Sequence, residues 1–179
     1  MAGWINVDSA SLPGVDIVCD LEAVRSSPIP LPDNSVDEFL LSHVIEHIRD
    51  SLGLMQELWR LARPGAVAGI RTPHGSTDAA WEDPTHVRPY FVGSFGFFSQ
   101  PHYWRADYGY RGDWQPEVVH LLVEGRHFEG LDPAQCYEKV QGGRNLVREM
   151  ICEMRAVKPA RECRRELIVA PRIEIVRVD

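Results

Sequence analysis

The stretch LPDNSVDEFLLSHVIEHI, residues 31–48, decides the fold. It begins in a proline-rich loop that ends with an Asp-Asn pair, a composition typical of turns. Residues 36–41 follow with apolar side chains on both faces, as in a buried strand that is covered on both sides. This segment therefore favours a parallel sheet with helices packed against it.

The segments on either side repeat the alternation of strand and connection. Residues 5–8 and 15–19 are two short predicted strands. A helix begins at Ser51, which is placed to cap it, and ends at the next Pro-Gly pair; residues 66–72 are the next strand. The pattern over residues 4–73 predicts an α/β fold with a Rossmann-like, mostly parallel sheet flanked by helices.

The second half of the chain differs from the first in composition and in its pattern of predicted elements. Residues 84–116 are rich in aromatic side chains and form an insertion or a lid within a single domain that spans residues 1–179. Residues 117–124 are a strand. Apolar residues at helical spacing predict a helix over residues 145–157. Residues 167–178, interrupted by Pro171, form either a final strand pair or one kinked strand, and residues 173–178 are the preferred member of the sheet. Antiparallel closing strands at the edge of the sheet fit this segment.

Composition limits the classes of function. The formal net charge is −7, and residues 1–141 hold 10 Lys and Arg against 20 Asp and Glu, which argues against a nucleic-acid partner. No apolar run is long enough to cross a membrane, and no export signal is visible, so we expect a cytoplasmic protein. The four cysteines have no zinc-finger spacing, and we expect reduced, mostly buried thiols.

Two carboxylates follow predicted strands. Asp8 ends the first strand and Asp20 follows the second. An acidic residue at the carboxyl end of a strand can accept hydrogen bonds from both hydroxyls of a ribose. Because carboxyl ends of parallel strands share one edge, the two acids predict a nucleoside site there.

A set of motifs in a fixed order carries a resemblance to a known family. These motifs are Gly3-Trp4-Ile5-Asn6-Val7-Asp8, Asp20-Leu21, residues 31–37, residues 43–48, Glu57-Leu58-Trp59-Arg60 and Arg63-Pro64-Gly65. In this order they resemble class I S-adenosylmethionine-dependent methyltransferases, in particular the type 11 group. The resemblance covers residues 3–73 and continues more loosely through residues 83–86. It implies that Asp8 holds the cofactor ribose, that Asp20 and Leu21 flank the adenine, and that Ser42 and His43 line the methionine end.

The chain also departs from that family. The family's first strand and its glycine-rich loop lie upstream of the segment that resembles Gly3-Trp4, and no such loop occurs in this sequence. The fold is therefore expected to be incomplete on its N-terminal side. Three outcomes remain open: the strand over residues 5–8 moves into the gap, a homodimer covers it, or the chain is a truncated form without full cofactor binding.

A second constellation is the His43-x-x-Glu46-His47 segment. In a helical turn these side chains share one face, and His86 from the Asp-Pro-Thr-His segment at residues 83–86 is a candidate fourth ligand. Three imidazoles and a carboxylate suit a divalent metal such as Zn or Mn. The arrangement is similar to the Glu-x-x-Glu-His motif of small-RNA 2′-O-methyltransferases and ubiquinone-pathway O-methyltransferases, with His43 in place of the first Glu.

Three functions compete on these observations. The first is methyl transfer from S-adenosylmethionine to a small-molecule or glycan-like acceptor, with His47 or His86 as general base for a hydroxyl. The second is a non-catalytic methyltransferase-like binding or scaffold domain that has lost the cofactor. The third is a metal-dependent enzyme that uses His43, Glu46, His47 and His86.

Overall fold

The computed structural model describes residues 3–178. The strands are β1 Val7–Asp8, β2 Ile17–Val18, β3 Val36–Ser42, β4 Ala62–Pro73, β5 Trp114–Glu124, β6 Val147–Ala156 and β7 Arg172–Val178. The helices are α1 Ser51–Leu61, α2 Ala79–Glu82 and α3 Pro133–Gly142, with 3₁₀ turns η1 Leu21–Ala23, η2 Ile45–His47, η3 Val92–Phe98, η4 Gln100–Trp104, η5 Gly125–His127 and η6 Arg165–Leu167. None of these helices is long and apolar enough to span a membrane.

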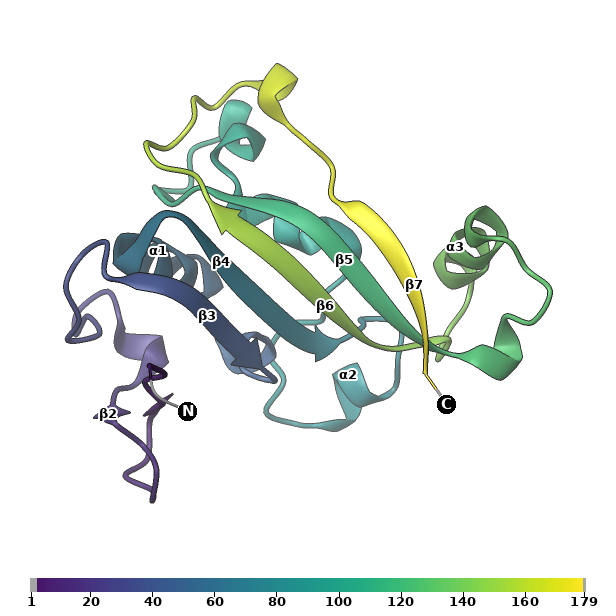
Figure 1. Ribbon diagram of the computed structural model, residues 1–179, viewed down its shortest axis with the longest axis horizontal. Coiled ribbons are helices and arrows are strands. Elements are labelled where there is room, and N and C mark those ends of the chain that lie inside the picture. The colour runs from purple at the N-terminus through teal and green to yellow at the C-terminus, as the bar shows by residue number, and fades with distance from the viewer. Residues whose placement is uncertain (1–2, 179) are drawn as a thin grey trace.

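Five strands form the main sheet in the order β3-β4-β6-β5-β7 (Figure 1). Pairing is parallel between β3 and β4 and between β5 and β7, whereas β6 runs antiparallel to both of its neighbours. The predicted fold class, a mostly parallel sheet with helices, is confirmed. The antiparallel pairing lies within the sheet at β6, and the C-terminal edge strand β7 is parallel to its neighbour.

The prediction of a helix over residues 145–157 is wrong, because most of this segment forms strand β6. Its buried residues are Val147, Met150, Cys152, Met154 and Ala156, mostly at every second position. The apolar residues at 146, 147, 150, 151 and 154 fit helical spacing equally well. The position between β4 and β5 resolves the ambiguity, because a strand there forms backbone hydrogen bonds on both sides.

Helix α1 was predicted correctly, but its cap lies one residue earlier. The Asp50 side chain accepts a hydrogen bond from the Gly53 N–H at 2.9 Å, so Asp50 and not Ser51 caps the helix. Helix α3 was not predicted. It begins with a capping box between Asp132 and Gln135 and has Pro133 in its first turn.

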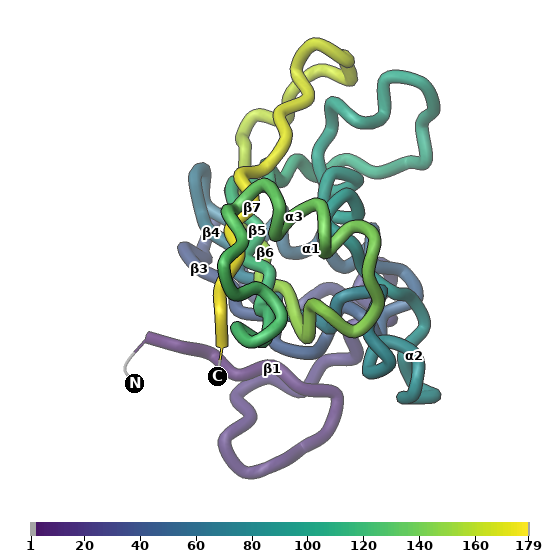
Figure 2. The backbone as a smooth tube through the Cα atoms, turned by 90° about the vertical axis from the view of Figure 1, so that its right-hand side faces the viewer, coloured from purple at the N-terminus to yellow at the C-terminus, as the bar shows by residue number. Residues whose placement is uncertain are grey.

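The helices α1, α2 and α3 lie on one side of the sheet (Figure 2). The opposite face is polar and carries ion pairs such as Arg155–Glu117 at 2.6 Å and His120–Glu174 at 3.1 Å. The Leu40 side chain on β3 is 68% exposed. The prediction that this strand is covered on both faces is therefore wrong.

The aromatic-rich segment divides between core and surface. Six of its aromatic side chains are buried: Tyr90, Phe95, Phe98, Tyr103, Tyr110 and Trp114. Four are exposed: Phe91, Phe97, Trp104 and Tyr108. All four cysteines are free, and three of them are buried, as expected.

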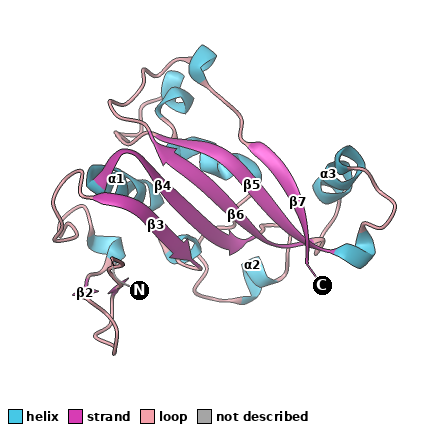
Figure 3. Cartoon of the chain, viewed as in Figure 1, coloured by secondary structure: helices cyan, strands magenta, loops and turns pink. Residues whose placement is uncertain are grey.

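The N-terminal strands β1 and β2 form a separate parallel pair beyond the β3 edge of the main sheet (Figures 1 and 3). Each is only two residues long, shorter than predicted. The Asp16 side chain closes the start of the pair by accepting the Asn6 N–H at 2.8 Å. Among the described strands, none pairs with the outer edge of β3.

Candidate functional site

Asp8 and Asp20 lie at the same end of the β1–β2 pair. The register places Asp8 beside Val18, and the Cys19 N–H donates to the Asp8 carbonyl at 2.8 Å. One oxygen of each carboxylate holds a local turn, accepting the backbone N–H of Ala10 at 2.8 Å and of Glu22 at 3.0 Å. Within residues 3–178 the second oxygen of each carboxylate accepts no hydrogen bond and is available to a ligand.

The segment after β2 is joined to the segment that follows η2. Glu22 accepts the Arg49 N–H at 2.8 Å, and Arg25 forms an ion pair with Asp50. The Arg25 guanidinium holds the pKa of Asp50 below its ordinary value by hydrogen bonding. Leu21 packs against the core at this junction. These contacts join the segment after β2 of the small sheet to the segment that leads from η2 to α1.

The end of β3 carries Ser42, which is exposed, and His43. His43 has a left-handed backbone with φ of 54°, an uncommon conformation for a residue with a side chain. Its N–H donates to the Arg71 carbonyl at 2.9 Å. Its Nδ1 lies 3.2 Å from a Glu46 oxygen and its Nε2 lies 3.2 Å from a Glu149 oxygen, so the ring bridges η2 and β6.

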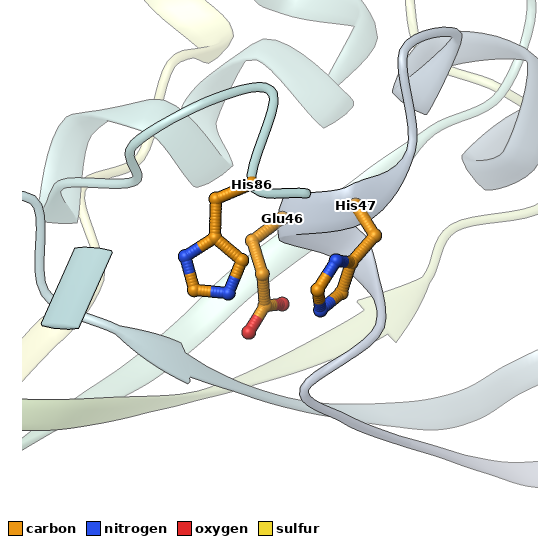
Figure 4. Close-up of side chains that lie close together, drawn as sticks. All are labelled: Glu46, His47 and His86. Carbon is orange, nitrogen blue, oxygen red and sulfur yellow. The ribbon is translucent and has the colours of Figure 1, made fainter. Parts of the chain in front are cut away.

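Glu46, His47 and His86 converge just beyond this point (Figure 4). One nitrogen of each histidine and one Glu46 oxygen lie within 4.8 Å of one another. The two rings meet edge to face with centroids 4.7 Å apart. Of the four residues predicted to bind metal, the structure brings these three into one group, and His43 approaches Glu46 from outside it.

Thr85 and Asp83 support the cluster from the loop that also carries His86. The Thr85 hydroxyl donates to Asp83 at 2.6 Å and lies 2.9 Å from Nδ1 of His47. The Thr85 hydroxyl and N–H together hold the pKa of Asp83 below its ordinary value. The Thr85 side chain thus fixes the loop of residues 83–86 against His47 of η2.

A groove of about 410 Å³ follows the carboxyl end of β4. It is lined by His74, Ser76, Phe91, Tyr137 and five further residues of the 92–93 and 140–143 segments. Sequence reasoning did not single out His74. The available signal was its place directly after a strand, where ligand-binding residues of α/β sheets gather.

His74 is buried, and burial lowers its pKa. The Ser76 N–H donates to its Nδ1 at 3.3 Å, which favours the neutral ring because protonation of Nδ1 would remove this acceptor. The contribution of the neutral ring to stability is complete above the ordinary histidine pKa and is lost as the pH falls below it.

We therefore expect the free energy of unfolding to decrease between about pH 7.5 and about pH 5.5, and to decrease less in His74→Asn. Urea denaturation at the two pH values measures the difference. His127→Asn, a change at an exposed histidine, is the control and should keep the wild-type dependence. Equal pH dependence in wild type and His74→Asn would contradict the assignment.

Comparisons with known proteins give matches to methyltransferases. Residues 5–70 match the family model described as "Methyltransferase domain". A probable S-adenosylmethionine-dependent methyltransferase of Mycolicibacterium smegmatis is 36% identical over 73 residues, which cover 38% of this chain and 28% of that protein. The chain thus matches little more than a quarter of this curated relative's length.

Two solved structures share the fold. A SAM-dependent methyltransferase from Archaeoglobus fulgidus superposes with a TM-score of 0.55 at 15% identity, covering 84% of this chain and 75% of that one. The YcgJ protein of Bacillus subtilis gives a TM-score of 0.52 at 12% identity, covering 87% and 82%. At these identities the likeness concerns the fold alone.

Proposed function

Because this chain is related to the class I S-adenosylmethionine-dependent methyltransferases, through the domain matched at residues 5–70 and the shared fold, we propose that it transfers a methyl group from S-adenosylmethionine to an acceptor. The observation that carries the proposal is the shared rim. The free carboxylate oxygens of Asp8 and Asp20 lie at one end of β1–β2, and hydrogen bonds from η1 join that end to the segment after η2.

The residues at this rim fit the nucleoside half of the cofactor. Asp8 has a free oxygen for the ribose hydroxyls, and Asp20 with Leu21 offers an edge for the adenine. Ser42 and His43 are the residues we propose for the methionine end. Among the described strands none pairs with the outer edge of β3, and we propose that a second copy of this chain covers that edge.

The cofactor supplies an activated sulfonium methyl group, so the protein's task is alignment and exclusion of water. His47 and His86 are the side chains that we propose to assist the acceptor. Each has its Nδ1 engaged, by Thr85 at 2.9 Å and by the Ala80 carbonyl at 3.3 Å. The other nitrogen of each ring is free to take a proton from a hydroxyl or to hold an ion.

A small-molecule or glycan-like acceptor is the class that we propose. The groove beside His74 has a volume within the range of small-molecule sites. Phe91, 44% exposed, lines it and offers a ring on which a sugar or aromatic group can stack. The net charge of −7 opposes binding of a long polyanion.

We expect Asp8→Ala to weaken binding of S-adenosylhomocysteine by about 10- to 100-fold, because the hydrogen bonds of a charged carboxylate to the ribose contribute about 1.5–3 kcal/mol. Isothermal titration calorimetry measures the affinity. The matched control is Asp16→Asn, which changes an acid at the opposite end of the same strand pair and keeps an acceptor for the Asn6 N–H. Its affinity should equal that of the wild type.

Two outcomes would contradict the proposal. Wild-type affinity weaker than about 1 mM would favour a scaffold domain without cofactor. Equal loss in Asp8→Ala and Asp16→Asn would show that the change acts through folding of the strand pair. Sedimentation velocity on the same samples tests the proposed homodimer, which a monomer at the titration concentration would overturn.

A further inference from the structure

The cluster of Glu46, His47 and His86 is built from two segments that the backbone holds together. Glu46 and His47 belong to η2, directly after β3, and His86 lies in the loop after α2. The Val87 N–H donates to the Glu46 carbonyl at 2.9 Å and fixes the loop against η2. The three side chains thus meet without depending on a long flexible connection.

Within residues 3–178 neither oxygen of the Glu46 carboxylate accepts a hydrogen bond, although Nδ1 of His43 lies 3.2 Å from one of them. The Glu46 side chain is only 3% exposed. An ionised carboxylate removed from water costs several kcal/mol unless a cation or hydrogen bonds compensate. In Figure 4 the carboxylate lies between the imidazole rings of His47 and His86, where a bound cation would compensate its charge.

The hydrogen bonds of the two histidines define which nitrogen is free. The Thr85 hydroxyl gives its only hydrogen to Asp83, so it must accept from Nδ1–H of His47. The Ala80 carbonyl can only accept, so Nδ1 of His86 must donate to it. Both neutral rings therefore carry their lone pair on Nε2. An outer partner on the opposite nitrogen is the arrangement that orients metal-binding histidines.

We propose that Glu46, His47 and His86 bind one divalent ion of the zinc class. Two imidazole nitrogens and a carboxylate oxygen suit borderline metals such as Zn²⁺, whereas Mg²⁺ and Ca²⁺ prefer oxygen ligands throughout. Three protein ligands leave a coordination position for water or a ligand oxygen. The Nε2 atoms of His47 and His86 would bind the ion and could then no longer accept a proton. With metal bound, the ion would take over from the two histidines the activation of an acceptor hydroxyl. The site itself stands independently of the proposed function.

The test uses the full chain purified without a histidine tag. After chelator treatment and buffer exchange, calorimetric titration with ZnCl₂ should show one ion per chain. Glu46→Gln, which keeps the shape of the side chain, and His86→Gln should each weaken Zn²⁺ binding by about 10-fold or more. Zn²⁺ should raise the thermal midpoint of the wild type, and it should raise that of Glu46→Gln by a smaller amount at the same Zn²⁺ concentration.

The matched control is His120→Gln. His120 lies between Glu153 at 3.4 Å and Glu174 at 3.1 Å on the open face of the sheet, which makes it the alternative His-carboxylate site. This variant should bind Zn²⁺ as the wild type does. The proposal is overturned by absence of binding, by wild-type affinity in Glu46→Gln, or by loss of binding in His120→Gln. Titration of the same variants with S-adenosylhomocysteine keeps the two proposals apart, because either ligand can bind or fail alone.

Discussion

Asp113→Ala is expected to lower the free energy of unfolding by about 3–5 kcal/mol, because it leaves a mostly buried guanidinium without its counter-charge. The Asp113 side chain is fully buried, and that of Arg161 is 21% exposed. Arg161 donates to both carboxylate oxygens, at 2.7 and 2.8 Å, and its backbone N–H donates a third hydrogen bond at 2.9 Å. The Gln100 N–H adds a fourth at 3.1 Å.

This pair connects three parts of the chain: the residue just before β5, the start of η4 and the segment after β6. Urea denaturation of the single variants and of Asp113→Ala with Arg161→Ala measures the coupling, and the double variant should lose less than the sum. Asp107→Ala removes an ion pair of the same type, with Arg111, that lies in solvent. That control should unfold at nearly the wild-type midpoint. Additive losses would contradict the coupling.

The second large effect is expected at Trp114, the first residue of β5. Its side chain is fully buried, and its Nε1–H donates a hydrogen bond to the Met55 carbonyl at 2.9 Å. Its ring packs edge to face against that of Phe39, with the ring centroids 5.8 Å apart. Trp114→Ala removes a large core side chain and should cost about 3–5 kcal/mol. Thermal or urea unfolding measures the change.

Trp114→Phe separates the two contributions, because it keeps an aromatic ring and removes the hydrogen bond to α1. It should cost about 1–3 kcal/mol. Trp81→Ala is the surface control: the side chain is 62% exposed and donates one hydrogen bond to the Gly75 carbonyl, so the cost should be about 1 kcal/mol or less. A Trp81→Ala cost equal to that of Trp114→Ala would contradict the role assigned to burial.

The secondary structure of the first half of the chain was largely predictable, because each hydrophobic pattern there fits only a helix or only a strand. Helix α1 has a single apolar face and clear end signals, and β3 and β4 each contain a short apolar run, at residues 39–41 and 66–70. The β6 segment has two solutions, and only its neighbours β4 and β5 select the strand. Helix α3 buries just Cys136 and Val140, so its periodicity was too weak to detect although its capping signals were present.

The candidate site follows the same division. Residues at strand ends were predictable, because parallel pairing alone brings Asp8 and Asp20 to one edge. The approach of His86 to Glu46 was anticipated from residue types, but it is made by the Val87–Glu46 backbone hydrogen bond, which no local pattern contains. His74 was missed because its groove forms only when α3 packs beside β4.

The place of β6 has a consequence for synthesis of the protein. The ribosome delivers β4 and β5 first, yet in the finished sheet they are not neighbours, because β6 lies between them. Both strands therefore lack this neighbour until residues 147–156 have been synthesised, and β5 gains its other neighbour, β7, later still. The main sheet thus depends on late pairings between strands that are distant in sequence, which slow the folding of β-structure.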